Sequence, residues 1–139
     1  MAVTLASSTA PVDGNVGAYL DGWVQTLVSA QPITVTDTTA YFTLPYMAVG
    51  GKVKLVVNIS ALTGGSSPTL TVAYAESIDG GATYNGTAAL TTTALNATGI
   101  TYTAVASGPV FNGGRLSFTV GGTGTPTFTT SVYMVAWNR

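Results

Sequence analysis

Two runs of alternating apolar and polar residues, separated by a glycine-rich loop, constrain the fold of this chain most. In the run 52–60 every second residue is apolar: Val53, Leu55, Val57 and Ile59. The run 69–77 repeats the pattern with Leu70, Val72 and Tyr74. A period of two is typical of a strand that buries one face. Because the intervening loop Thr63–Pro68 is rich in residues that interrupt strands, we predict an antiparallel hairpin here.

Similar short runs recur along the rest of the chain. We predict further strands at Trp23–Val28, Ile33–Asp37, Ala40–Leu44, Asn85–Thr98, Ile100–Val105, Arg115–Val120 and Thr127–Asn138. Pro32 is expected to break the pattern, and the loop 121–126 (GGTGTP) is expected to connect its flanking strands as a hairpin. About eight to ten short strands with turn residues between them are typical of an all-β antiparallel sandwich or jelly roll.

One segment, 17–30, fits two interpretations. Its apolar residues Leu20, Trp23, Val24, Leu27 and Val28 have the spacing of a helical stripe. The pair Asp21-Gly22 and the β-forming residues that follow favour a strand, which we prefer. Ahead of this segment, residues 1–15 are expected to form an N-terminal arm or a short strand, and residues 16–139 the single β-sandwich domain.

The surface of this domain carries very few charges. Only 6% of the residues are charged, against about 25% in a typical globular domain, and the net charge is −1. Near-neutral surfaces favour association, so we infer that much of the surface is covered by copies of the chain or by another protein. The alternative is a monomer kept in solution by Thr and Ser hydroxyls. Five apolar residues are candidates for such an interface: Val3, Leu5, Trp23, Tyr133 and Trp137. The competing interpretation is that the aromatic ones fill the core.

The sequence offers little for chemistry. It has no cysteine and no histidine, which excludes thiolate sites, Ser-His-Asp arrangements and the usual zinc sites. Of its five acidic residues, Asp13, Asp21 and Asp79 directly precede glycine, a pair typical of turns. We therefore predict no enzymatic activity, no catalytic or metal-binding residue and no cofactor.

Partners and location follow from what the sequence lacks. No basic cluster is present, so direct nucleic-acid binding is not expected. No apolar run is long enough for a membrane helix, and the N-terminus does not have the pattern of a secretory signal. We expect synthesis in the host cytoplasm and no contact with a membrane.

The most specific local motif is the eight-residue turn from Ser77 to Tyr84, SIDGGATY. It resembles the Asp-box, Ser-x-Asp-x-Gly-x-Thr-aromatic, found at hairpin turns of sialidases and many other β proteins. In such a turn Ser77 and Asp79 accept hydrogen bonds from backbone N–H groups, Gly80 permits the reversal, and Tyr84 packs back on the sheet. The motif indicates a folding role and gives no support to glycosidase activity.

Together with the Thr-, Gly- and Ala-rich composition, the stretch Glu76–Tyr84 resembles tailed-phage virion structural proteins, most closely head decoration (cement) proteins. This resemblance implies a homo-oligomer, such as a trimer, that binds a major capsid protein and reinforces the shell of the virion. One alternative is a phage tail, fibre or carbohydrate-binding β-sandwich module, since the chain has seven Tyr and two Trp. Another is a small coat protein that encloses nucleic acid, although four basic residues are few for that task.

Overall fold

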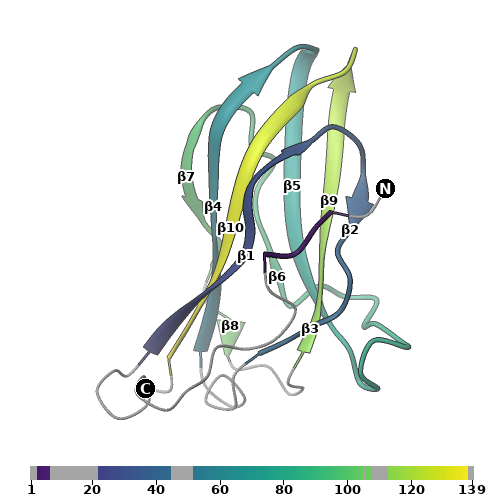
Figure 1. Ribbon diagram of the computed structural model, residues 1–139, viewed down its shortest axis with the longest axis vertical. Coiled ribbons are helices and arrows are strands. Elements are labelled where there is room, and N and C mark those ends of the chain that lie inside the picture. The colour runs from purple at the N-terminus through teal and green to yellow at the C-terminus, as the bar shows by residue number, and fades with distance from the viewer. Residues whose placement is uncertain (1–2, 7–21, 45–51, 105, 108–112, 138–139) are drawn as a thin grey trace.

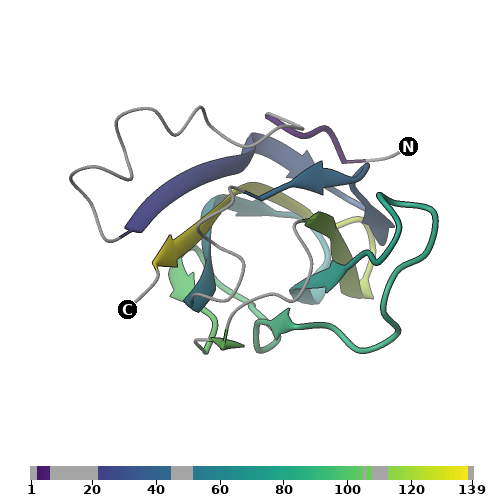
Figure 2. The same cartoon turned by 90° about the horizontal axis from the view of Figure 1, so that it is seen from below.

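The predicted β-sandwich is confirmed. A computed structural model describes residues 3–6, 22–44, 52–104, 106–107 and 113–137, and these form two five-stranded antiparallel sheets packed face to face (Figure 1). The described residues contain no helix. Viewed along the strands, both sheets curve around a common core (Figure 2).

Five long strands, β1, β4, β5, β9 and β10, build most of the sandwich. The strands are β1 Gly22–Ile33, β2 Asp37–Thr38, β3 Phe42–Thr43, β4 Lys52–Thr63, β5 Ser66–Glu76, β6 Leu90–Thr91, β7 Gly99–Tyr102, β8 Ala106–Ser107, β9 Gly113–Thr123 and β10 Thr127–Trp137. The first sheet has the order β1-β10-β4-β7, with β8 also paired to β4. The second sheet has the order β2-β9-β5-β6, with β3 also paired to β9.

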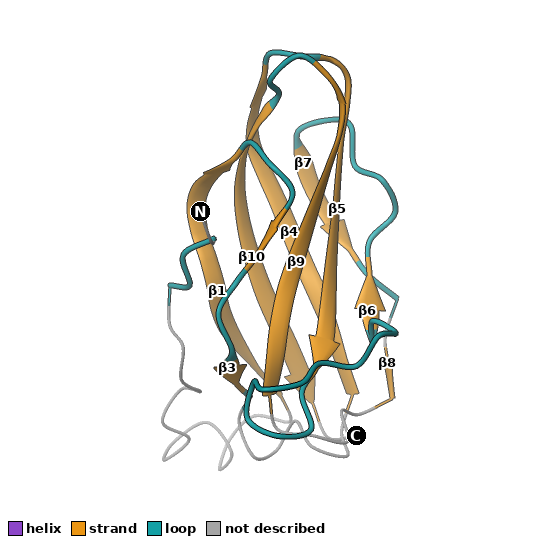
Figure 3. Ribbon diagram, turned by 90° about the vertical axis from the view of Figure 1, so that its right-hand side faces the viewer, coloured by secondary structure: helices purple, strands orange, loops and turns teal. Residues whose placement is uncertain are grey.

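The two predicted hairpins are wrong, because each joins strands of different sheets. β4 pairs with β10 and β5 pairs with β9, so both β4–β5 and β9–β10 cross from one sheet to the other. We call these two connections the arches, at residues 63–66 and 123–127. They lie side by side at one end of the sandwich (Figure 3). A period of two arises in a hairpin and in an arch alike, since in both the apolar side chains point to the core.

Glycine makes the contact between the arches possible. Gly64 and Gly65 both have a positive φ, +74° and +72°. A Cβ on Gly64 would lie 2.7 Å from the carbonyl oxygen of Thr125 in the neighbouring arch. A side chain at this position would therefore be strained by its backbone and would also press on the other arch.

From Gly22 onward, where the structure describes it, the ambiguous segment is a strand, as preferred, but it is a bulged one. In β1, Thr26 pairs with Tyr133 and Val28 with Val132, which leaves Leu27 as an extra residue. Both Leu27 and Val28 are completely buried. A bulge turns two successive side chains towards the same face. This is why these neighbouring apolar residues imitate the spacing of a helix.

Pro32 does not end β1, contrary to the prediction. The strand continues to Ile33, with Pro32 paired to Thr129. β1 is the edge strand of the first sheet, and proline is tolerated in edge strands because one side of the strand has no partner. The two strands predicted at 33–37 and 40–44 are much shorter than expected, at Asp37–Thr38 and Phe42–Thr43.

Threonine hydroxyls explain why two further strands are shorter than predicted. Within 85–98 only Leu90–Thr91 forms a strand, and the next residue, Thr92, accepts the N–H of Val72 with its hydroxyl at 3.0 Å. β7 ends at Tyr102, and the hydroxyl of Thr103 accepts the N–H of Leu55 at 2.9 Å. In both places a side-chain oxygen replaces the carbonyl that would extend the ladder.

Candidate functional site

The predicted interface residues fall into three groups. Val3 is only 5% exposed and packs in the core, and Leu5 packs against it. Tyr133 lies half-buried on the outer side of β10. The side chains of Trp23 and Trp137 lie outside the described residues.

The N-terminal segment 3–6 is held by its own chain. The N–H of Val3 donates to the carbonyl of Thr38 at 3.1 Å, and the N–H of Ala6 donates to the carbonyl of Leu27 at 2.7 Å. It therefore runs from the second sheet to the edge of the first, as the purple trace in Figure 1 shows. Val3, which was a candidate interface residue, is thus buried and hydrogen-bonded within its own chain.

A surface of large apolar side chains lies on the outside of the first sheet. Its members alternate with core residues along β1, β4 and β10, and those on β7 pair with the outward residues of β4, so all point away from the second sheet. We call it the outer apolar face, formed by Val24, Val56, Ile100, Tyr102, Tyr133 and Val135. Val24 is 58% exposed, and Ile100 and Tyr102 are each 60% exposed. Exposed apolar groups gathered on one sheet face are a mark of an interaction surface.

The strand register places two tyrosines of this face in one row. Tyr133 pairs with Val56, and Val56 pairs with Tyr102. Neighbouring strands are about 4.8 Å apart, so the two tyrosines stand about 10 Å apart across the sheet. The ammonium of Lys54 lies 4.6 Å from the centre of the Tyr102 ring. Lys54 also pairs with Val135 and shares the outer side of β4 with Val56, so this cation–π contact places a positive charge within the outer apolar face.

The outer side of the second sheet is chemically different. Its β5 and β9 positions carry small or hydroxyl side chains: Thr69, Thr71, Ala73, Ala75, Ser117 and Thr119. Arg115 belongs to the same side and lies over the ring of Tyr84, 4.1 Å from its centre. The two outer surfaces of the sandwich thus present unlike chemistry to a partner.

Sequence reasoning missed Ile100, Tyr102 and Val24 as surface residues. The alternation of Ile100 and Tyr102 with threonines predicts a strand, but the usual assumption is that the apolar side faces inward. Here Thr103 is buried instead, because its hydroxyl bonds to the backbone of β4. No short sequence pattern around Thr103 indicates that the threonine side of this strand faces the core.

The turn after β5 uses its polar side chains on its own backbone. The Ser77 hydroxyl accepts the N–H of Gly81 at 2.7 Å, and the Asp79 carboxylate accepts the N–H of Thr83 at 2.6 Å. Ser77 and Tyr84 face each other in an isolated bridge. The hydrogen bond from Thr83 is the main cause that lowers the pKa of Asp79. Its carboxylate is therefore engaged in holding the turn.

The other two acidic side chains in the described residues, Asp37 and Glu76, have different surroundings. Asp37 accepts the N–H of Thr38 at 2.8 Å, which lowers its pKa. Glu76 is buried at the end of β5, and its charge adds to burial in raising the pKa of Tyr74. No group of three or more metal-ligating side chains occurs within the described part of the chain.

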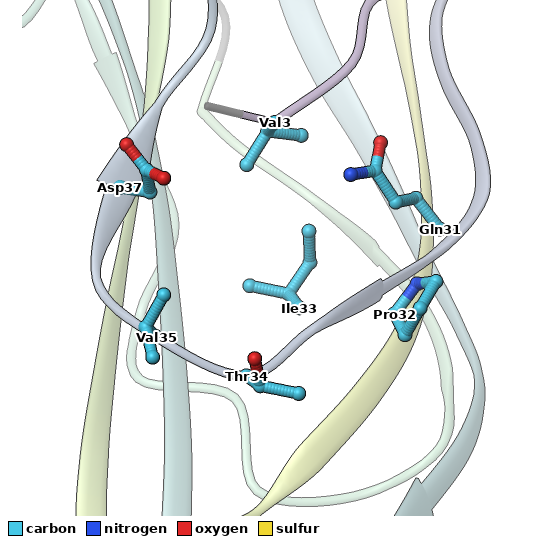
Figure 4. A pocket seen from close by; sticks show the side chains of 7 residues that line it. All are labelled: Val3, Gln31, Pro32, Ile33, Thr34, Val35 and Asp37. Atoms are coloured by element: carbon cyan, nitrogen blue, oxygen red, sulfur yellow. The ribbon is translucent and has the colours of Figure 1, made fainter. Parts of the chain in front are cut away.

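The two hollows beside the N-terminal segment are small or shallow. One of about 90 Å³ is lined by Gln31–Val35 together with Val3 and Asp37 (Figure 4). Pockets for small organic ligands usually measure about 300–1,000 Å³. On the other side of the segment, a shallow groove of about 510 Å³ runs along Thr4–Ala6 and Ser29–Pro32, without a charged side chain. The outer apolar face remains the stronger candidate.

Comparison with known protein families and with curated proteins finds no match to this chain. Among the described residues, no helix is long and apolar enough to cross a membrane.

Proposed function

We propose that this protein is a non-enzymatic structural subunit of a virion, a capsid decoration or cement protein. It acts as a homo-oligomer and binds a major capsid protein, stabilising the shell by burying surface between subunits. The observation that carries this proposal is the outer apolar face, which leaves large apolar side chains such as Ile100 and Tyr102 mostly exposed.

The composition supports the same mechanism. With 6% charged residues, the chain has little electrostatic repulsion to overcome when its surface is buried. Each apolar side chain removed from water contributes about 1.5–3 kcal/mol when burial is complete. A single contact of this kind is modest, but many copies on one shell act together.

Electron microscopy of the native particle, together with binding of purified protein to particles stripped of it, tests this function. Val56→Lys places a charge in the middle of the outer apolar face, and Thr71→Lys makes the matched change on the second sheet. Both positions are half-buried on central strands. We expect V56K to lose particle binding and T71K to keep it. Particles without this chain, or V56K binding as the wild type does, would overturn the proposal.

A second candidate function is carbohydrate binding by the same face. The favouring observation is the row that holds Tyr102 and Tyr133, because sugar rings stack on aromatic side chains. A glycan array separates the two functions: retained glycans with binding lost in Tyr102→Ala would favour this candidate.

A further inference from the structure

We infer that two copies of this chain pair through the edge strand β7, forming one continuous sheet across a two-fold axis at Thr101. This inference rests on the self-association that forms part of the proposed function, and it names the contact. An unpaired edge strand is a template for another strand, and proteins normally protect such edges.

The opposite edge of the first sheet is protected in three ways. β1 contains Pro32, which has no N–H to offer. Its pairing with β10 is shifted twice, at Thr26/Val28 and at Val28/Gln31. The segment 3–6 also lies along it, with the N–H of Ala6 bound to the carbonyl of Leu27. A second strand could not pair in register along this edge.

The edges of the second sheet are covered or very short. β2 has two residues, and the N–H of Val3 already occupies the carbonyl of Thr38. β6 also has two residues, and beyond it Leu95 returns to pair with Leu70. β7 has four residues without proline or charge, and among the described strands it pairs only with β4. It is the most accessible edge of the described fold.

The backbone direction of β7 identifies the groups that would bind. The N–H of Thr103 donates to the carbonyl of Leu55 on β4. Since residues of an antiparallel strand face the partner alternately, Thr101 also points its N–H and carbonyl to β4. Ile100 and Tyr102 therefore direct theirs outward, to the open side.

Antiparallel pairing about Thr101 satisfies these groups symmetrically. Ile100 faces Tyr102 of the second copy, and Tyr102 faces Ile100 of the second copy. Each pair exchanges two N–H···O=C bonds, which gives four bonds in total. The side chains of both pairs project on the same side and extend the outer apolar face across the axis. No charged residue of β7 opposes another at this contact.

Sedimentation equilibrium of the full chain over a range of concentrations tests the pairing. Ile100→Lys and Val24→Lys form a matched pair, because both add one charge to an edge strand at a position 58–60% exposed. We expect a dimer for the wild type, weakened about tenfold or more by I100K and little changed by V24K. A strictly monomeric or trimeric wild type, equal effects of the two variants, or a stronger effect of V24K would each overturn the inference.

Two further measurements test directly whether the backbone of β7 forms the contact. Ile100→Pro removes the outward N–H and the isoleucine side chain but no hydrogen bond to β4, so circular dichroism should stay native while dimerisation is lost. Hydrogen exchange at the Tyr102 amide should slow as the wild-type concentration rises. A dimer with a fast-exchanging Tyr102 amide would refute the β7 contact.

Particle binding is measured separately from dimerisation. V56K is expected to lose binding to the particle and to keep the dimer, because Val56 lies one strand inside the edge. If the wild-type protein dimerises but does not bind the particle, only the proposed function is wrong. If it binds the particle but does not dimerise, only the β7 contact is wrong.

Discussion

Single glycines decide whether the two arches can lie against each other. Adding a side chain to a glycine can strain the backbone and can press on neighbouring atoms, and three glycines of this chain separate these two effects. Gly64 combines a positive φ with a close neighbour, whereas Gly80 has φ +69° and nothing within 4 Å of its Cβ position. Gly86 also has open space, and its φ is not positive. The chain thus contains its own set of controls.

We expect Gly64→Ala to lower the free energy of unfolding by about 3 kcal/mol, since it adds backbone strain and a contact with the other arch. Gly80→Ala should cost about 1–2 kcal/mol from strain alone. Gly86→Ala should change stability by less than about 0.5 kcal/mol. Urea unfolding measures all three. Equal losses for G64A and G80A would show that the arches do not press on each other.

The charge of Asp79 makes the stability of the turn depend on pH. Its pKa is lowered in the folded protein, mainly by the N–H of Thr83, so the charged carboxylate is favoured by folding. The resulting stability is complete above the ordinary pKa of about 3.9 and is lost as the pH falls through the lowered folded value. The variant Asp79→Asn keeps an acceptor oxygen and removes the charge.

D79N should therefore melt at a lower temperature than the wild type at neutral pH, and the difference should shrink below about pH 4. Thermal unfolding followed by circular dichroism over this pH range measures it. Asp37 titrates in both proteins and cancels in the comparison. A difference in melting temperature that is independent of pH would show that the carboxylate charge does not hold the turn.

How far the sequence predicts a hydrogen bond depends on how local that bond is. The roles of Ser77 and Asp79 can be anticipated because their partners lie within four residues. The hydroxyl of Thr92 bonds to a residue 20 positions away, and that of Thr103 to one 48 positions away. A short sequence motif is enough to predict the local hydrogen bonds. The long-range hydrogen bonds can be seen only in the folded structure.

At the scale of elements, strand positions are easier to predict than strand partners. The alternation in 52–60 and 69–77 correctly indicates two strands with inward apolar side chains. It does not say whether the chain reverses within a sheet or crosses to the other one. That choice is made by the pairing of β4 with β10 and of β5 with β9, across more than 35 residues of sequence. A long-range pairing of this kind leaves no local trace in composition or spacing.

The bulge in β1 gives a prediction at the same scale. In a regular strand one of Leu27 and Val28 would face solvent, but here both are completely buried. We expect Leu27→Ala to cost about 2–5 kcal/mol and Val28→Ala about 1.5–3 kcal/mol. Val24→Ala, at an exposed position of the same strand, should be nearly neutral. Denaturant unfolding tests this, and a neutral result for L27A or V28A would contradict the bulged register.

At the scale of the whole molecule, the sandwich has two unlike outer surfaces and few charges. The first sheet presents large apolar side chains together with Lys52 and Lys54, and the second presents mainly small and hydroxyl ones. Association of such a molecule depends on apolar burial and on backbone hydrogen bonds of an open edge. Neither interaction is weakened strongly by simple salts, and sulfate strengthens apolar burial.

The dimer should therefore respond to salt in a characteristic way. Raising NaCl from about 0.05 to 0.5 M should change the wild-type dissociation constant by less than about threefold, because β7 carries no charge and the nearby Lys54 ammonium already contacts the Tyr102 ring of its own chain. I100K should behave differently, since its two added ammonium groups meet near the axis and repel each other. Screening shortens the range of that repulsion from about 10 Å at 0.1 M to about 3 Å at 1 M, so salt should partly restore its dimer. Sedimentation equilibrium across the salt series measures both responses. A wild-type dimer that weakens steeply with NaCl would show that charged groups hold it together, and β7 pairing would then be the wrong contact.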